Sequence, residues 1–525
     1  MKKTGKFLFI VLFHIIFFCV WAQMQEDIPP KQTVIYLLHA DTTSFDEAVN
    51  PDIKVLTGNV SFRHDSSFMY CDSAYLYEST NSLEAFGNVR MEQGDTLFLY
   101  GDHLLYDGNM QLARMREHVR MENKNVTLFT DSLNYDRSVN VGYYFEGGLI
   151  VDEENELSSF YGQYSPDTKQ AVFNDSVRLN NPDFTLYSDT LHYQTDSKIA
   201  TILGPSVIES DSGTIYSSRG WYNTETNVSL LLDRSQVVSG DKTLMGDSIL
   251  YDKTVGYSEV FGNMFLQDTL QKAILRGEYG FYNELTEYAF ATDSACFMEY
   301  SEGDTLYLHA DTIRMATVDS TSREVKAYYG VRFYRTDLQG VCDSMRYNTR
   351  DSVLYMYTDP VVWNGEYQLY GDTILVFLND SSIQYVHVME FAFAVQYLNV
   401  SCYNQLKGND MKAYFEQQAV RQIDVGGNVE SIYYVIDGGE MVGMNHTKSP
   451  YLTIWLKDNQ MDKIKMWPAS EGTNYPIPDL TPELKLLKDF YWFDYLRPKN
   501  KDDIYQVIRR KTEDVPKRGN KFVHS

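Results

Sequence analysis

Aspartate recurs in this sequence at a regular spacing that a metal-binding or catalytic site could use. A ten-residue phrase such as LYGDHLLYDG (99–108) returns along the chain, and its fourth residue recurs at intervals of 29 to 33 residues. Repeated carboxylates can ligate calcium, and two neighbouring ones can form the acid and base of a glycosidase. The aligned positions are Asp72, Asp102, Asp131, Phe160, Asp189, Ser218, Asp247, Glu278, Asp311, Asp343 and Asp372.

Both chemical interpretations fit this pattern poorly. Calcium-binding solenoids repeat every nine residues with paired glycines, and this sequence has no such repeat. A catalytic pair would occur once, whereas this aspartate returns in most copies of the phrase. We therefore predict a structural role, in which the carboxylate accepts backbone N–H groups at the turn where a strand begins.

Motifs typical of catalysis and cofactor binding are absent from the sequence. No two glycines lie two residues apart, which excludes every G-x-G phosphate loop. There is also no H-E-x-x-H, C-x-x-C or G-x-S-x-G motif. The sequence therefore predicts a protein that is not an enzyme and that holds no cofactor and no metal.

The elements that carry the repeated aspartate are predicted to be short strands. After Asp131 the apolar residues Leu133 and Tyr135 alternate with the polar Ser132 and Asn134, which is the period of a sheet with one face in water. A second phrase, such as GNVSF (58–62) or GNVRM (87–91), precedes each copy and reads as a turn followed by another strand. A unit of about 29 residues with two strands buries its apolar face only by stacking on its neighbours. The prediction is a β-solenoid or a long folded sheet.

The chain after residue 385 is predicted to be less regular. Residues 386–470 read as a modified continuation of the sheet, with a hairpin that turns at Asp458-Asn459. Prolines then mark an irregular stretch within residues 471–525, which we expect to hold one short helix over 482–496 and a flexible basic tail.

The first 22 residues are predicted to be a cleaved export signal. Lys2 and Lys3 precede an apolar run that ends at Val20, and a small-residue cleavage site follows at Ala22. The run is shorter than the roughly 20 residues that span a bilayer. The mature chain is therefore expected in an oxidising compartment, where the scattered Cys71, Cys296, Cys342 and Cys402 are most simply free buried thiols, with one disulfide left open.

The net charge of −26 bears on the kinds of partner that the chain can bind. So acidic a chain argues against binding to nucleic acid and against electrostatic docking to anionic lipid surfaces. A hydrophobic content of 43% also excludes wholesale disorder.

The alternation of G-N-V with G-D-x-L-x-Y, clearest in AFGNVRMEQGDTLFLYGDHLLYD (85–107), resembles the OstA/LptA family of periplasmic lipopolysaccharide-transport proteins. The resemblance covers residues 33–385 and implies an all-β fold, a long repetitive β-jellyroll or "β-taco" solenoid. It also implies an apolar interior that holds lipopolysaccharide acyl chains, and edge strands that pair with other transport proteins. The chain is longer than a compact member of that family, so a lengthened bridge or a relative in outer-membrane assembly is expected.

The inner wall of this trough is expected to bind lipid through its alternating apolar residues. The periplasm is the expected location, with an association with the outer membrane left open. The alternative is a secreted β-solenoid that binds or cleaves polysaccharide, which would need an acidic cleft and an exposed aromatic strip. The expected lipid-binding residues are Val60, Phe62, Val89, Met91, Leu104, Tyr106, Val119, Met121, Leu133, Tyr135, Leu191, Tyr193, Ile249, Tyr251, Met345 and Tyr347.

Overall fold

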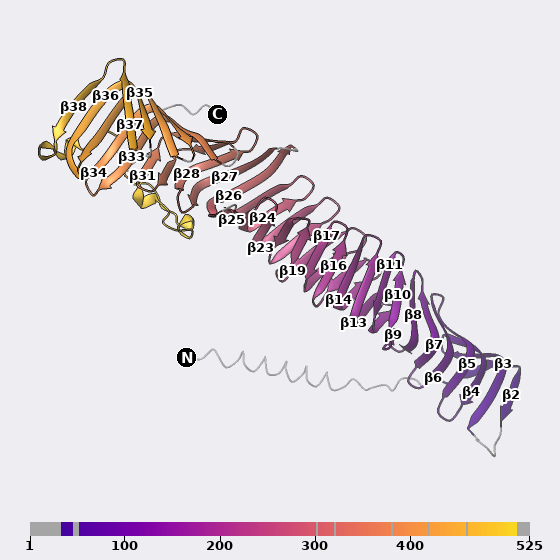
Figure 1. Cartoon of the computed structure of the whole chain (residues 1–525). Coiled ribbons are helices and arrows are strands. Elements are labelled where there is room, and N and C mark those ends of the chain that lie inside the picture. Colours follow the sequence, from indigo (N-terminus) through magenta and orange to yellow (C-terminus); the bar gives the residue numbers. More distant parts are fainter. Residues whose placement is uncertain are drawn as a thin grey trace, which may run out of the picture. The chain divides into compact units, whose positions relative to one another are not determined.

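The computed structural model describes residues 33–45, 52–300, 303–319, 322–379, 382–417, 419–457 and 460–511. Most of these residues lie in antiparallel strands, which confirms the all-β prediction (Figure 1). The export signal and the turn at 458–459 lie outside the described residues. The chain divides into two compact units, residues 1–199 and 200–525, which are described separately.

In unit 1, strands β3 to β8 pair with their neighbours in chain order. Shorter strands follow, so that β8 pairs with both β9 and β10, and β13 pairs with both β11 and β12. Its strands are β1 (Tyr36–His39), β2 (Thr42–Phe45), β3 (Ile53–His64), β4 (Ser67–Tyr77), β5 (Ser82–Gln93), β6 (Leu97–Asp107), β7 (Leu112–Asn123), β8 (Val126–Asp136), β9 (Val141–Tyr144), β10 (Gly148–Asp152), β11 (Asn155–Ser159), β12 (Tyr161–Ser165), β13 (Gln170–Asn181) and β14 (Phe184–Gln194). Strand β15 (Ile199–Ile202) lies at the division between the units.

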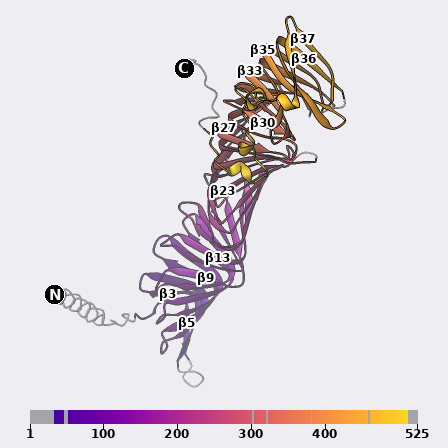
Figure 2. The ribbon, with the colours of Figure 1, turned by 90° about the vertical axis from the view of Figure 1, so that its left-hand side faces the viewer.

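Unit 2 continues with the same kind of strand and ends in a segment with short 3-10 turns (Figure 2). Its elements are β16 (Ser206–Ser210), β17 (Gly213–Ser217), β18 (Arg219–Asn223), β19 (Val228–Leu232), β20 (Gln236–Ser239), β21 (Lys242–Met245), β22 (Ser248–Asp252), β23 (Tyr257–Asp268), β24 (Ala273–Asn283), β25 (Tyr288–Glu299), β26 (Leu306–Asp319), β27 (Ser322–Tyr334), β28 (Gln339–Asn348), β29 (Val353–Tyr357), β30 (Val361–Asn364), β31 (Tyr367–Tyr370), β32 (Thr373–Asn379), β33 (Ser382–Asn399), β34 (Cys402–Glu416), β35 (Ala419–Asp437), β36 (Glu440–Lys457), β37 (Gln460–Trp467), β38 (Glu471–Pro476), η1 (Ile477–Asp479), η2 (Pro482–Leu484), η3 (Asp494–Leu496) and η4 (Asp503–Tyr505).

The long strands of unit 1 bend in the middle and so belong to two walls. The register of β4 against β5 shifts between Tyr70 and Ser73, and that of β5 against β6 shifts between Phe86 and Val89. Such bulges bend a strand and increase its twist. We name the side that holds residues 73–77, 82–86, 103–107 and 132–136 the A wall of unit 1. The B wall holds residues 60–64, 67–70, 89–93 and 119–123.

The bend between the walls, here called the crease, is where the repeated Gly-Asn and Asp residues lie. Gly87 and Asn88 both have positive φ angles, 71° and 46°, in the middle of β5. The Asn88 side chain donates a hydrogen bond of 2.8 Å to Asp72, which lies in the middle of β4. The predicted turns at strand entrances were therefore wrong: turn-forming residues serve here to bend a continuous strand.

The same side-chain pair recurs along the crease of each unit. In unit 1, Asn59 donates to Asp41 at 2.9 Å, and His118 takes the place of asparagine opposite Asp102 at 2.7 Å. In unit 2, Asn263 donates to Asp247 at 2.7 Å. Asp72, Asp102 and Asp247 thus each bond to the residue at which a neighbouring strand bends.

Replacing Gly87 with alanine should destabilise unit 1 by about 2–4 kcal/mol, because an L-residue is strained at this φ and the new Cβ is crowded. The Cβ atom would lie 2.6 Å from Asp72 Oδ2. Gly94 is a matched control, since its φ of 62° is similar but no atom lies within 4 Å of the place that a new methyl group would take. We expect Gly94→Ala to cost only about 1 kcal/mol in urea denaturation. Equal losses for the two variants would remove the crowding argument.

Unit 2 also has two walls, and the C-terminal strands extend them. From β28 onward, the A wall holds residues 344–348, 353–357, 373–379, 382–389, 410–416, 419–426 and 451–457. The B wall holds residues 339–341, 361–364, 367–370, 392–399, 402–407, 429–437 and 443–449. Strands β37 and β38 both pair with β36, one with each half.

Three further findings concern the cysteines, the expected helix and the membrane. Cys71, Cys296, Cys342 and Cys402 are free and buried, in line with the simplest prediction. The short helix expected over 482–496 is wrong, because this stretch contains only the 3-10 turns η2 and η3. Within the described ranges, no helix combines the length and the apolar character needed to cross a bilayer.

Candidate functional site: an apolar trough closed along its rim

The apolar faces of the two walls of unit 1 point toward each other and fill the space between them. Twelve of the expected lipid-binding residues lie here, and none is more than 2% exposed. On the B wall these are Val60, Phe62, Val89, Met91, Val119 and Met121, and on the A wall Leu104, Tyr106, Leu133, Tyr135, Leu191 and Tyr193. The trough of unit 1 is therefore packed shut, and an acyl chain can reach these side chains only when the walls part.

The four expected residues of unit 2 are also on inner faces. Ile249, Tyr251 and Met345 are buried, whereas Tyr347 is half-buried. Further along the A wall of unit 2, Val376, Ile423 and Ile454 are likewise only half-buried. The interior of unit 2 is less tightly closed on this wall than the interior of unit 1.

A ladder of tyrosine hydroxyls closes the open edge of unit 1, which we call the rim. Tyr106, Tyr135, Tyr164 and Tyr193 lie 29 residues apart near the ends of A-wall strands. Each hydroxyl is bonded to a polar side chain of the B wall 41 or 42 residues earlier in the sequence. The pairs and their distances are Tyr106–His64 at 2.6 Å, Tyr135–Gln93 at 3.1 Å, Tyr164–Asn123 at 3.3 Å and Tyr193–Asp152 at 2.8 Å.

Tyr106, Tyr135 and Tyr164 are buried hydroxyl groups that stay protonated. Burial raises the pKa of Tyr164 to about 12 and raises the pKa values of Tyr106 and Tyr135 as well. A buried hydroxyl that loses its partner leaves an unsatisfied polar group on each wall, at about 1–3 kcal/mol. The ladder therefore opposes separation of the walls in unit 1.

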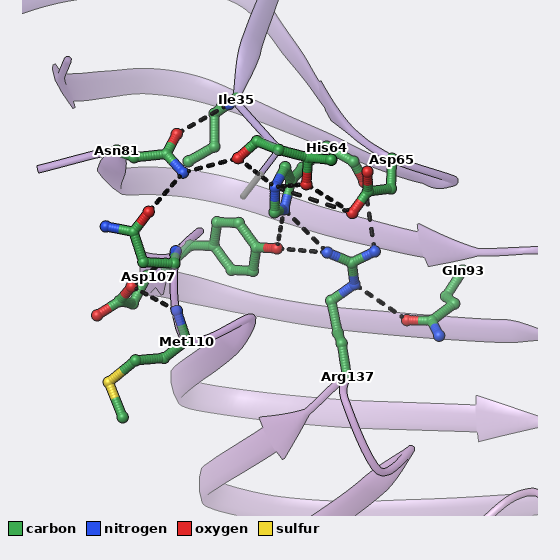
Figure 3. A network of polar contacts seen from close by, with 11 residues as sticks. Ile35, His64, Asp65, Asn81, Gln93, Asp107, Met110 and Arg137 are labelled. Carbon is green, nitrogen blue, oxygen red and sulfur yellow. Dashed lines mark hydrogen bonds and ion pairs between the residues drawn. The ribbon is translucent and has the colours of Figure 1, made fainter. Parts of the chain in front are cut away.

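The first rung of the ladder is part of a larger network around Arg137 (Figure 3). The Arg137 guanidinium, 9% exposed, donates to His64 Nδ1 at 3.0 Å, to the Tyr106 hydroxyl and to Gln93 Oε1 at 3.3 Å. Because Arg137 donates to Nδ1, the proton of the neutral imidazole is assigned to Nε2. His64 Nε2 lies 3.1 Å from the carbonyl oxygen of Thr33, which accepts that proton's hydrogen bond.

The last rung contains a buried ion pair. Asp152 is 1% exposed and lies 2.8 Å from Lys198 Nζ, while its second partner is the Tyr193 hydroxyl. Asn155 also donates to the Tyr193 hydroxyl at 3.0 Å. This rung joins both walls through a charge that is almost completely removed from water.

Lowering the pH should weaken unit 1 through His64. Burial, and then the nearby Arg137 charge, hold the pKa of His64 below its usual value, against the hydrogen bond to Thr33 and the Asp65 carboxylate. In the unfolded chain His64 binds a proton below about pH 6.5, whereas in the folded chain it stays neutral to a lower pH. The free energy of unfolding therefore falls as the pH is lowered from about 6.5 toward the pKa of His64 in the folded chain.

The measurement is the free energy of unfolding of the wild type and of His64→Gln at pH 8 and pH 5. Glutamine can still donate and accept at this place, but it does not titrate. The difference between the two pH values should be smaller in the variant. An equal pH dependence in both proteins would show that His64 does not control it.

A shallow groove on unit 1 is the place to test the polysaccharide alternative. It is lined by the aromatic residues Tyr100 and Phe129, by the basic side chains Arg90, His118 and Arg120, and by the carboxylates Asp102, Asp131 and Glu146. Arg120 lies over the Tyr100 ring, 4.4 Å from its centroid. The described residues contain no group of three or more His, Cys, Asp and Glu side chains placed to hold a metal ion.

Sequence reasoning placed the apolar residues on inner faces but missed the rim. Tyr164, His64, Gln93, Asn123, Asp152 and Arg137 were not singled out. The 29-residue spacing of the tyrosines could have indicated these hydrogen bonds. A tyrosine hydroxyl that is buried at the same place in each repeat needs a hydrogen-bond partner. Their partners could not be paired from sequence, since the 41- or 42-residue separation depends on where each strand bends.

The structure thus defines a two-walled antiparallel β-fold with an apolar interior. Residues 32–189 match the family model described as OstA-like protein, which confirms the resemblance carried by the paired phrases over that part of the chain. One similar solved structure is the crystal structure of LptH from Pseudomonas aeruginosa, described as the LptA homologous periplasmic component of the conserved lipopolysaccharide transport device. It is 14% identical, with a TM-score of 0.18, and the match covers 19% of this chain and 76% of that one. No curated protein matches this chain.

Proposed function

We propose that this protein binds the acyl chains of lipopolysaccharide between its two walls and helps to carry or bridge them across the periplasm to the outer membrane. The observation that carries the proposal is the pair of facing apolar walls in the region that matches the OstA-like family. Such an interior removes methylene groups from water at about 0.8 kcal/mol each. The saccharide and phosphates would remain outside, and the rim would open to admit the chains.

Edge strands supply the contacts with other transport proteins in this proposal. Strands β37 and β38 pair with β36 at the C-terminal end of the sheet, and β2 pairs with β3 at its beginning. Exposed strand edges are templates for pairing with a partner's strand.

The test is photo-crosslinking to lipopolysaccharide from inner and outer positions of the same strands. The aromatic photo-crosslinker p-benzoylphenylalanine replaces the inner Tyr135 and Tyr193, or the outer Phe129 and Tyr187, which are 42% and 40% exposed. Crosslinks confined to the inner positions would support the proposal. The absence of inner crosslinks in folded protein would remove the lipid, and a glycan array would then test the groove near Tyr100.

A further inference from the structure

The segment that follows β38 runs across the inner face of the B wall of unit 2. We name residues 482–505 the strap; it carries the 3-10 turns η2 to η4 and is drawn in yellow in Figure 1. Its Leu487, Phe493 and Leu496 are buried against B-wall residues that include Trp363, Tyr370, Phe393, Val395, Ile432 and Tyr434. Ile504 is buried against Cys296 and Met298 of β25. The strap thus covers B-wall surface from β36 back to β25.

Two buried glutamines of the B wall hold the strap by its backbone with the same geometry. Gln405 donates to the carbonyl oxygen of Lys485 at 2.7 Å and accepts from the N–H of Leu487 at 2.8 Å. Gln368 donates to the carbonyl oxygen of Tyr491 at 2.8 Å and accepts from the N–H of Phe493 at 2.8 Å. Each amide therefore bonds residues n and n+2 of the strap, as a neighbouring β-strand would.

Further B-wall side chains bind the same segment. The Tyr370 hydroxyl donates to the carbonyl oxygen of Asp489 at 3.0 Å and accepts from the N–H of Tyr491 at 3.1 Å. Gln339 accepts a hydrogen bond of 2.8 Å from the side chain of Arg497. Gln368 and Gln405 are at most 2% exposed. The Trp363 indole and the Tyr403 carbonyl oxygen also bond to them, but the strap satisfies the Gln368 Nε2 donor and the Gln405 Oε1 acceptor.

An acyl chain could fill the apolar surface under the strap but could not satisfy the glutamines. It has no N–H or C=O groups along its length, and a buried amide without partners is destabilised. A polypeptide satisfies both needs, because it carries apolar side chains and its backbone offers a donor and an acceptor at every residue except proline. The B-wall surface under the strap therefore suits a peptide better than a hydrocarbon chain.

We propose that the B wall of unit 2 is a binding site for a polypeptide segment, that the strap is its resident ligand, and that acyl chains are excluded from it. In this site Gln368, Tyr370 and Gln405 form hydrogen bonds with the peptide backbone. The wall also packs against apolar side chains at the positions of Leu487, Phe493 and Leu496. Exclusion of acyl chains matters for transport only if the proposed function holds, but the peptide site does not depend on that function.

The experiment cuts the strap free without removing it from the folded protein. A protease site is inserted between Asp479 and Thr481, which are exposed, and the purified full chain is then cleaved. We expect the strap to stay bound during native size-exclusion chromatography. It should exchange with a labelled synthetic peptide of residues 480–511, and lipopolysaccharide micelles should not displace it.

The variant that tests the clamps carries Gln368→Leu together with Gln405→Leu, and it should release the cleaved strap about tenfold faster or more. Gln396→Leu is the matched control, because Gln396 lies on the same wall but bonds to the Tyr367 hydroxyl and Asn404 instead of the strap. Release of the strap by lipopolysaccharide, or equal release from the clamp variant and the control, would overturn the proposal.

A photo-crosslinker at Val395, under the strap, separates this inference from the proposed function. Val395 should crosslink to lipopolysaccharide neither before cleavage nor after it while the strap remains bound. A lipid crosslink at Val395 with the strap in place would overturn the exclusion of acyl chains. Failure of the inner positions in unit 1 to crosslink would count against lipid transport and leave the peptide site untouched.

Discussion

Replacing Trp363 with alanine should lower the free energy of unfolding of unit 2 by about 3–5 kcal/mol, the usual cost of removing a large buried aromatic side chain. Trp363 is fully buried, and it packs in the cluster where the strap meets the B wall. Its Nε1 also donates to Gln368 Oε1 at 3.0 Å, so the change disturbs a clamp as well as the packing. The strap should become more open to hydrogen exchange.

Tryptophan fluorescence measures this effect selectively. Five of the six tryptophans (Trp221, Trp363, Trp455, Trp467 and Trp492) lie in unit 2, and the sixth, Trp21, lies in the predicted export signal. Trp467→Ala is the control, because its ring is 37% exposed and its removal should cost less than about 1 kcal/mol. Equal losses in the two variants would show that the strap cluster does not stabilise unit 2.

Replacing Lys198 with methionine should destabilise unit 1 by about 3–5 kcal/mol, because it leaves the Asp152 carboxylate buried without its counter-charge. Asp152 would keep the Tyr193 hydroxyl, 2.8 Å away, but a single neutral donor does not replace an ammonium group. Amide hydrogen exchange of peptides from β10, β11 and β14 would follow this end of the rim.

The double variant Asp152→Asn with Lys198→Met distinguishes the buried charge from other effects of the lysine. Asparagine keeps an acceptor for Tyr193 and removes the charge, so most of the lost stability should return. A double variant as unstable as Lys198→Met would mean that the lysine acts through packing of its stem instead.

The sequence predicted the strands and their inner faces well because both depend on local pattern. Alternation such as Ser132-Leu133-Asn134-Tyr135 after Asp131 determines which side chains share a face, and eleven aligned copies made the pattern hard to mistake. The crease was misread for a related reason. Gly87 and Asn88 are residues typical of turns, and nothing local distinguishes a turn that ends a strand from a bulge that bends one.

The strap could not be predicted from the sequence, because its conformation depends on distant side chains. LKLLKDFYWFDYL (484–496) is apolar enough to suggest a helix, and a helix would have satisfied its own backbone. In the folded chain Gln368 and Gln405 supply those hydrogen bonds instead, from 80 to 125 residues away in the sequence. Tertiary contacts then override the local preference.

The long sequence separation of the strap contacts sets an order of events during folding. Neighbouring strands are joined by turns of a few residues, so the walls can grow by local steps as the chain is synthesised from its N-terminus. The strap is made after the strands that it contacts, and its contacts reach back 158 residues to Gln339 and 171 residues to Arg332. The strap can therefore dock only after the strands that it contacts have been made, and a chain that stops before residue 482 leaves the inner face of the B wall exposed.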